Sequence, residues 1–371
     1  MRDISLYIHI PFCKSKCAYC DFLSFAEGDA LFALYTDALT DEIQKKAPAY
    51  ADDRIATIFM GGGTPTILPA HMLGRIWETV RNCFSIDRDA EITMEANPES
   101  TNAEKLTLCR SYGVNRISFG LQSLDDRLLK RIGRAHNRET FLTAYQIARE
   151  AGFQNISLDL MYGLPGQNLM DFQSTLAEAV SLSPQHLSCY NLILEEGTPL
   201  AKDEHLALPG ESQELAMYAL AQEFLAQHGY RPYEISNYAL PGYESRHNLA
   251  YWTDKPYLGL GLGAHSYLDG QRFHQTEDLK AYLAGGFEAK DIITLTPMDH
   301  MSEFMFLGLR KRSGVSFSEF SAAFGQDMQQ IFPAAIQKHV SGGLLAMDES
   351  GIRLTDRGVN LSNQVFLDFL L

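Results

Sequence analysis

Short apolar segments alternate with longer amphipathic ones over the first 230 residues of the chain. The short segments are rich in β-branched and aromatic residues and are typical of buried strands. They are Ser5–Ile10, Ile55–Met60, Glu91–Glu95, Arg116–Phe119, Ile156–Met161 and His186–Leu192. In the longer segments apolar side chains recur every three or four positions, which predicts helices. These are Asp29–Lys46, Met72–Cys83, Ala103–Tyr112, Arg138–Glu150, Leu169–Leu182 and Gln213–His228.

Six strands, each followed by a helix after a short connection, predict an α/β fold. The strands would form a parallel sheet, closed or partly closed, with the helices outside it. In folds of this kind the functional residues gather at the C-terminal ends of the strands. We therefore expect a partial (β/α)6 barrel of the TIM type over residues 1–240, with a connecting segment over residues 241–293.

The pattern changes at about residue 294. Helical segments at His300–Leu309, Phe317–Phe324 and Met328–Val340 precede a hairpin that turns at Glu349–Gly351. Helices followed by a two-stranded wing predict a winged-helix-like α+β domain over residues 294–371. Its six Lys and Arg against nine Asp and Glu over residues 291–371 give a net charge of −3, which favours packing or partner docking over DNA binding.

Composition narrows the classes of function. The 371 residues are 46% hydrophobic and carry a formal net charge of −15. This charge argues against nucleic-acid binding, which depends on basic surface, and against anionic membrane surfaces. No apolar run is long enough to cross a membrane, although transient contact with membrane-bound acceptor proteins, as partners of this chain, stays open. With no apolar leader and six unevenly spaced cysteines, the sequence predicts a soluble protein of a reducing compartment, the cytoplasm.

Three cysteines follow the first predicted strand in a C-x3-C-x2-C run, Cys13, Cys17 and Cys20. Thiolates this close can converge on one soft metal centre. An iron–sulfur cube normally takes four thiolates, so three would leave one iron open to an exchangeable ligand. Disulfides fit a reducing compartment poorly. A zinc site completed by His9 stays open as an alternative.

Polar residues interrupt the ends of the next strands. They are the glycine segment Gly61-Gly62-Gly63-Thr64-Pro65, Glu95, Gln122 and Asp159, with Arg134 further along. Each alone is typical of a turn or of a structural hydrogen bonder. Several at the same end of neighbouring strands predict a polar ligand beside the cysteine loop.

These motifs resemble the radical S-adenosylmethionine (radical SAM) superfamily, whose signature is C-x3-C-x2-C with an aromatic residue, here Tyr19, before the last cysteine. Gly120-Leu121-Gln122-Ser123 and Tyr162-Gly163-Leu164-Pro165-Gly166 make the chain similar to the coproporphyrinogen-dehydrogenase-related branch. The resemblance implies a 4Fe-4S cluster on Cys13, Cys17 and Cys20. It also implies S-adenosylmethionine bound by Tyr7, Tyr19, Gly62, Gly63, Thr64, Glu95, Gln122, Arg134 and Asp159. In this superfamily the cofactor supplies the difficult radical step and the protein directs it.

Within the branch, three features resemble the haem chaperones of the HemW type more than the dehydrogenases. Asp21-Phe22 stands where the dehydrogenase pattern usually has a further cysteine two positions after Cys20, and only six residues precede Tyr7. His247-Asn248-Leu249-Ala250-Tyr251-Trp252 matches the H-N-x-x-Y-W motif associated with haem binding in that type. The resemblance thus implies haem and haem-accepting apoproteins as partners.

Histidine is the commonest proximal haem ligand, and Tyr and Trp can flank a porphyrin. On their residues alone, however, His247 is more typical of an ordinary hydrogen-bonded histidine and Trp252 of a core or surface anchor, and it is the resemblance that favours haem ligation. His265, in a glycine-rich segment, is a second candidate ligand or a packed strand residue. A radical enzyme that acts on a porphyrin or porphyrinogen, and a scaffold with a purely structural cluster, stay open as alternative functions.

Overall fold

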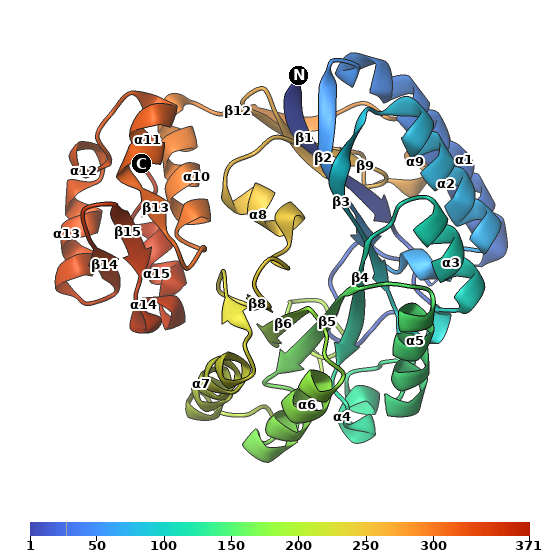
Figure 1. Ribbon diagram of the computed structural model, residues 1–371, viewed down its shortest axis with the longest axis horizontal. Helices are drawn as coiled ribbons and strands as arrows, with labels where there is room; N and C mark the ends of the chain where they lie inside the picture. The colour runs from blue at the N-terminus through green and yellow to red at the C-terminus, as the bar shows by residue number, and fades with distance from the viewer. Residues whose placement is uncertain (27) are drawn as a thin grey trace.

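The computed structural model of the protein describes residues 1–26 and 28–371, and it shows a curved sheet with helices outside it and a smaller unit at the C-terminus (Figure 1). Six consecutive parallel strands form the centre of the sheet. They are β1 (Arg2–Ile10), β2 (Asp53–Gly62), β3 (Ile86–Ala96), β4 (Arg116–Gln122), β5 (Asn155–Tyr162) and β6 (His186–Asn191). The covering helices are α1 (Asp29–Lys46), α2 (Ala70–Cys83), α3 (Ala103–Ser111), α5 (Arg138–Glu150), α6 (Leu169–Ser181) and α7 (Glu211–Gln227). The predicted partial barrel is confirmed.

Alternation along the strands separates the two faces of the sheet. On β1, Leu6 and Ile8 are fully buried under the helices. The alternate positions face the interior of the curve, where Ser5 lies beside Thr57 of β2 and both are buried. A strand places successive side chains on opposite faces, so an apolar outer layer and a polar interior follow from one alternating pattern.

The sheet continues beyond the six predicted strands. Its order is β12-β11-β10-β9-β1-β2-β3-β4-β5-β6-β8-β7, and β9 pairs parallel to β1. The added strands are β7 (Arg231–Pro232), β8 (Asn237–Ala239), β9 (Tyr257–Leu260), β10 (His265–Leu268), β11 (Gln271–His274) and β12 (Lys290–Thr294). Residues 241–293, expected as a connecting segment, therefore contribute four strands to the barrel sheet.

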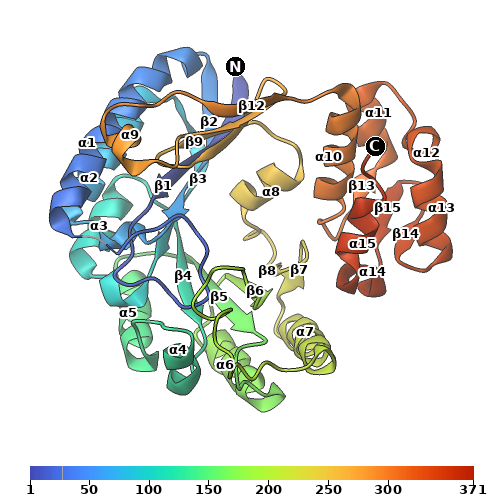
Figure 2. The same cartoon turned by 180° about the vertical axis from the view of Figure 1, so that it is seen from behind.

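Helix α8 (Arg246–Trp252) lies on the inner side of the curved sheet, as the view from behind also shows (Figure 2). Its first turn is held by Glu91 of β3, whose carboxylate accepts hydrogen bonds from the backbone N–H of Arg246 at 3.1 Å and of His247 at 3.0 Å. A carboxylate at this end satisfies N–H groups that lack partners in the helix and complements the helix dipole. Glu91 thus fixes α8 within the barrel.

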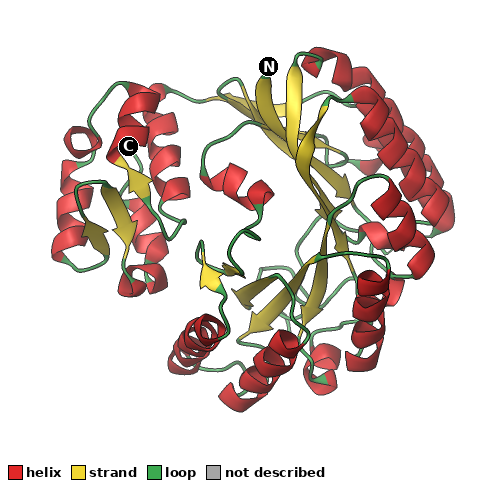
Figure 3. Ribbon diagram, in the orientation of Figure 1, coloured by secondary structure: helices red, strands yellow, loops and turns green. Residues whose placement is uncertain are grey.

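The C-terminal unit combines helices with a small antiparallel sheet of order β13-β15-β14 (Figure 3). Its helices are α10 (Pro297–Gly308), α11 (Phe317–Phe324), α12 (Met328–Ile331), α13 (Pro333–Ser341), α14 (Asp356–Asn360) and α15 (Ser362–Leu367). Its strands are β13 (Val315–Ser316), β14 (Leu345–Met347) and β15 (Gly351–Leu354), so the predicted hairpin is present. Phe320 is fully buried among Phe304, Phe324 and Phe332, which forms an aromatic core.

One helix was predicted wrongly as continuous. The segment Met328–Val340 is two helices, because Pro333 begins α13 and has no backbone N–H to continue the preceding helix. Two further short helices, α4 (Asp126–Arg131) and α9 (Leu279–Leu283), complete the described α-helices. None of the described helices has the length and apolar character needed to cross a bilayer.

Candidate cofactor site

The cysteine loop follows β1 and is pinned to the barrel by backbone hydrogen bonds. Cys13 N–H donates to Phe25 at 2.9 Å, and Ala18 is bonded through its N–H to Ile132 at 3.0 Å and through its carbonyl to Leu200 at 2.8 Å. All three thiols are free and partly exposed. A loop held at its base and its middle keeps the thiols at the C-terminal ends of the strands.

A cavity of about 140 Å³ opens beside this loop. The structure brings most of the predicted residues together around it. They are Cys13, Cys17, Tyr19, Cys20, Gly62, Gly63, Glu95, Gln122, Arg134 and Asp159. Thr64 lies behind the loop and donates to Cys13 Sγ at 3.6 Å. Tyr7 lies in a neighbouring larger cavity, which shares Gly62 and Glu95 with this one.

The glycine segment is required by close packing. A Cβ at Gly62, where φ is 107°, would stand 2.2 Å from His9 Nδ1, and one at Gly63 would stand 2.5 Å from the carbonyl oxygen of Phe12. A Cβ at Gly61 would be 2.6 Å from the carboxylate of Glu95. The end of β2 can therefore lie against β1, β3 and the start of the cysteine loop only without side chains, and this exposes its backbone to the cavity.

Two carboxyl groups stand in the cavity wall. Glu95 accepts from Gly62 N–H at 3.0 Å, and Ser118 Oγ donates to both oxygens of Asp159 at 3.3 Å. Burial raises the pKa of Glu95 to about 8, and the charge of Asp159 contributes. Burial also raises the pKa of Asp159. Two carboxyl groups whose ionisation is disfavoured by burial are suited to a ligand that brings positive charge.

Arg134 links the cysteine loop to the strand ends. Its guanidinium donates to Cys17 Sγ at 3.4 Å, to Asn97 Oδ1 at 2.7 Å and to the Gly120 carbonyl at 2.6 Å. Asn97 in turn donates to Thr64 Oγ1 at 2.7 Å. Asn97 was not among the predicted site residues, although its place directly after β3 could have indicated it.

The thiols fit a cluster better than a single ion. In residues 1–26 and 28–371 no three His, Cys, Asp or Glu side chains converge as one metal ion requires. Zinc needs its ligands within 2.0–2.3 Å of one centre, whereas each thiolate of a cube bonds its own iron. His9 does not complete a zinc site either: its Nδ1 is 2.9 Å from the Tyr7 hydroxyl and its Nε2 is 2.9 Å from the Leu23 carbonyl.

His247 is buried on the inner side of α8, with only 1% of its surface exposed. The Thr57 hydroxyl donates to Ser5, so it accepts from His247 Nδ1 at 2.8 Å, which leaves Nε2 to accept from the Tyr251 hydroxyl at 2.9 Å. Burial lowers the pKa of His247 to about 3. Both ring nitrogens are therefore engaged in this conformation, and haem ligation by His247 stays a prediction.

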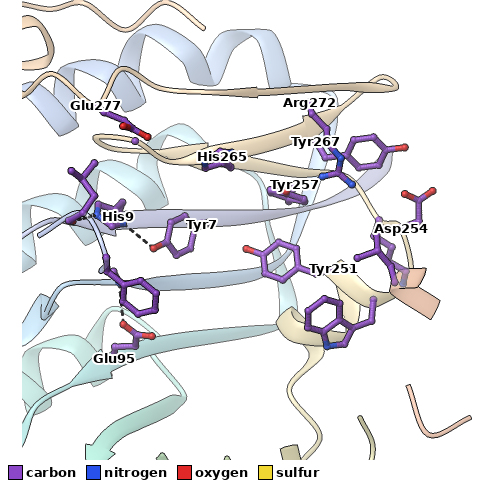
Figure 4. Close-up of a pocket in the computed structure, with 17 residues that line it drawn as sticks. Tyr7, His9, Glu95, Tyr251, Asp254, Tyr257, His265, Tyr267, Arg272 and Glu277 are labelled. Atoms are coloured by element: carbon purple, nitrogen blue, oxygen red, sulfur yellow. Dashed lines mark hydrogen bonds between the residues drawn. The ribbon is translucent and has the colours of Figure 1, made fainter. Parts of the chain in front are cut away.

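The larger cavity, of about 610 Å³, lies between β1, α8 and the added strands β9–β11 (Figure 4). Its wall includes the side chains of Tyr7, Tyr251, Trp252, Tyr257, His265, Tyr267 and Arg272. Most of these residues belong to strands that the sequence pattern did not predict, so the cavity itself could not be predicted. Four wall residues carried a signal in the sequence: Tyr251 and Trp252 through the motif that begins at His247, Tyr7 through the superfamily resemblance, and His265 as a second candidate ligand in a glycine-rich segment.

Comparison with known proteins places these features in a family. The radical SAM superfamily profile matches residues 7–179, and the HemN C-terminal domain profile matches residues 295–361. The chain is 40% identical to the heme chaperone HemW of Bacillus subtilis (strain 168), with 99% of each chain covered. It is 35% identical to heme chaperone HemW of Escherichia coli (strain K12), over 100% of this chain and 98% of the relative.

Among solved structures, coproporphyrinogen III oxidase (HemN) from Escherichia coli, described as a radical SAM enzyme, superposes with a TM-score of 0.89 at 27% identity. The match covers 100% of this chain and 90% of that one. The same barrel and C-terminal unit thus occur in both, while the full-length sequence identity is higher to the relatives named HemW. The chain therefore belongs to the HemW family of the radical SAM superfamily.

Proposed function

We propose that this protein is a haem chaperone that binds haem and passes it to acceptor apoproteins. The observation that carries the proposal is the aromatic cavity of about 610 Å³ that adjoins the cysteine loop and shares Gly62 and Glu95 with the smaller cavity. Its size and its aromatic wall suit a large planar ligand. The name of the relatives that match along the whole chain supports the same ligand.

In this proposal Cys13, Cys17 and Cys20 hold a 4Fe-4S cluster, and the smaller cavity takes S-adenosylmethionine. The backbone of Gly62 and Gly63 and the side chains of Tyr19 and Gln122 surround the ligand, while Thr64, behind the loop, donates to Cys13 Sγ. Glu95 and Asp159 face its positive charge, and Arg134 donates to Cys17. A bound cluster supplies electron transfer, and the residues around it orient the ligand and restrict solvent. Tyr7 lines the larger cavity together with Gly62 and Glu95, so it would reach S-adenosylmethionine from that side.

The alternative is a radical SAM enzyme of the coproporphyrinogen dehydrogenase type, which the structural match to HemN favours. Against it, Phe22 occupies the position where that type usually has a further cysteine. Phe22 is 64% exposed and lines both cavities, so it supplies apolar surface to a ligand where a thiol would supply a metal donor.

Experiments on anaerobically reconstituted protein distinguish the haem chaperone from the coproporphyrinogen dehydrogenase. We expect saturable haem binding followed by Soret absorbance, and transfer of that haem to an apoprotein such as apomyoglobin. With coproporphyrinogen III, S-adenosylmethionine and a reductant we expect no CO2 release. Stoichiometric CO2 and protoporphyrinogen formation would overturn the chaperone proposal in favour of the enzyme.

A further inference from the structure

The larger cavity contains one histidine whose ring is free to bind a metal. His265 begins β10, is exposed, and has no hydrogen bond to either ring nitrogen within the described chain. His9, the other histidine of the wall, has both nitrogens engaged by Tyr7 and Leu23. Iron needs an imidazole nitrogen with an available lone pair, so His265 meets a condition that His9 does not.

The strand register directs His265 into this cavity. On β10, His265 and Tyr267 share one face, and both line the cavity while Ser266 and Leu268 are buried behind them. The paired strand β11 places His274 opposite His265, with their rings stacked at 5.0 Å. His274 has both nitrogens bonded, to the Gln275 carbonyl and to Asp291. His274 therefore supports the ring of His265 and leaves its nitrogens accessible.

Titration of the surrounding groups agrees with this geometry. Burial lowers the pKa of His265, and the neighbouring charges of His274 and Arg272 add to the effect against that of Glu277. The hydrogen bond to Asp291 raises the pKa of His274. His265 is therefore neutral near pH 7, which is the form that binds iron.

The side chains of the motif that begins at His247 lie on two different sides of α8. Tyr251 and Trp252 face the cavity, whereas His247 lies behind them, stacked on Phe59 at 5.3 Å and bonded to the Tyr251 hydroxyl. Tyr251 also packs edge-on against Tyr257 at 4.7 Å. Through these contacts His247 holds the Tyr251 ring in its place in the cavity wall.

The mouth of the cavity carries one uncommitted cation. Arg272 is paired with Glu303, and Asp254 is paired with His300. Lys255 has no ion pair in the part of the chain that the structure describes. An exposed ammonium at the edge of an aromatic cavity suits a carboxylate of a ligand whose flat body lies inside.

We infer that haem, whose binding rests on the proposed function, lies in this cavity with His265 as the ligand to iron. Tyr251 and Trp252 flank the porphyrin, Lys255 meets a propionate, and His247 is a positioning residue. The ligand to the haem iron is therefore a histidine outside the motif at residues 247–252. The motif itself contacts the face of the porphyrin through Tyr251 and Trp252.

Haem titration of matched histidine variants tests the assignment. His265→Ala and the milder His265→Gln should remove the histidine signature of the bound iron in resonance Raman and electron paramagnetic resonance spectra, and weaken binding by about tenfold or more. Added imidazole should restore the signature in His265→Ala. His247→Ala should weaken binding while the signature stays, and His71→Ala, on the exposed start of α2, should match the wild type.

Three results would overturn the inference. An unchanged signature in both His265 variants would remove His265 as the ligand and leave the chaperone proposal standing. Loss of the signature in His247→Ala, with rescue by imidazole, would return the iron to His247. If the wild-type protein with its cluster intact bound no haem, the inference and the proposed function would both fail.

Discussion

Glu95 gives the sharpest quantitative test of the smaller cavity. Its carboxyl stands in the wall with a pKa raised to about 8 by burial and by the charge of Asp159. If S-adenosylmethionine binds there, its positive sulfonium centre favours the ionised carboxylate and lowers that pKa. Binding then releases a proton from Glu95, and the affinity must rise with pH up to about 8.

The size of the effect follows from the pKa. Well below pH 8 each pH unit changes the affinity about tenfold, because ionising the carboxyl costs about 1.4 kcal/mol per unit. Between pH 6.5 and pH 8.5 the gain is about twentyfold, since the ionised fraction rises from a few per cent to most of the population. Glu95→Gln keeps the shape of the side chain and removes the titration.

Isothermal titration calorimetry on the anaerobic holoprotein measures this directly. Titrations in buffers of different ionisation enthalpy count the protons released, and the difference between wild type and Glu95→Gln isolates the part due to Glu95 from any titration of the ligand. Equal pH profiles for the two proteins would show that Glu95 does not ionise when S-adenosylmethionine binds, as would a wild-type affinity that falls as the pH rises.

Three further substitutions test the framework that holds the two cavities. Gly62→Ala should destabilise the chain by about 2 kcal/mol or more and abolish S-adenosylmethionine binding, because its backbone is left-handed and its Cβ would meet His9; denaturant unfolding and calorimetry check both effects. Glu91→Gln should cost about 2 kcal/mol in denaturant unfolding, since it weakens charge-assisted bonds to the first turn of α8, and should lower haem affinity without changing cluster content. Phe320→Ala should lower the free energy of unfolding by about 3–5 kcal/mol, with S-adenosylmethionine affinity unchanged. A Phe320 variant as stable as the wild type would contradict the packing described for the C-terminal unit.

Strong periodicity made the barrel predictable from the sequence. The strands β1–β6 bury an apolar face under helices, so each appears as a clear alternating or apolar run; Arg138–Glu150 was predicted with its observed bounds. The short strands β9–β11 gave no such signal, because they are four residues long and interrupted by glycine turns. The pairing of β9 with β1, from which β10 and β11 continue the sheet, is a long-range contact that local pattern does not encode.

In the candidate site, too, some features could be predicted from the sequence and others depend on long-range contacts. The residues of the smaller cavity follow successive parallel strands, whose ends meet at one edge, so their convergence could be inferred from order alone. The environment of His247 could not. One ring nitrogen of His247 is hydrogen-bonded to Thr57, which lies 190 residues away in the sequence. The other is bonded to Tyr251, on the next turn of the same helix. Likewise, the accessibility of His265 depends on its pairing with β11.

We propose that this radical SAM protein carries haem and does not decarboxylate a porphyrinogen. The most direct test divides one anaerobic preparation, which contains the cluster and S-adenosylmethionine, into two samples. One sample receives haem, and the other receives coproporphyrinogen III with a reductant. We predict stoichiometric haem binding that can be handed to an apoprotein, with no CO2 released. No haem binding, or CO2 released together with protoporphyrinogen, would rule out the proposed haem-chaperone function.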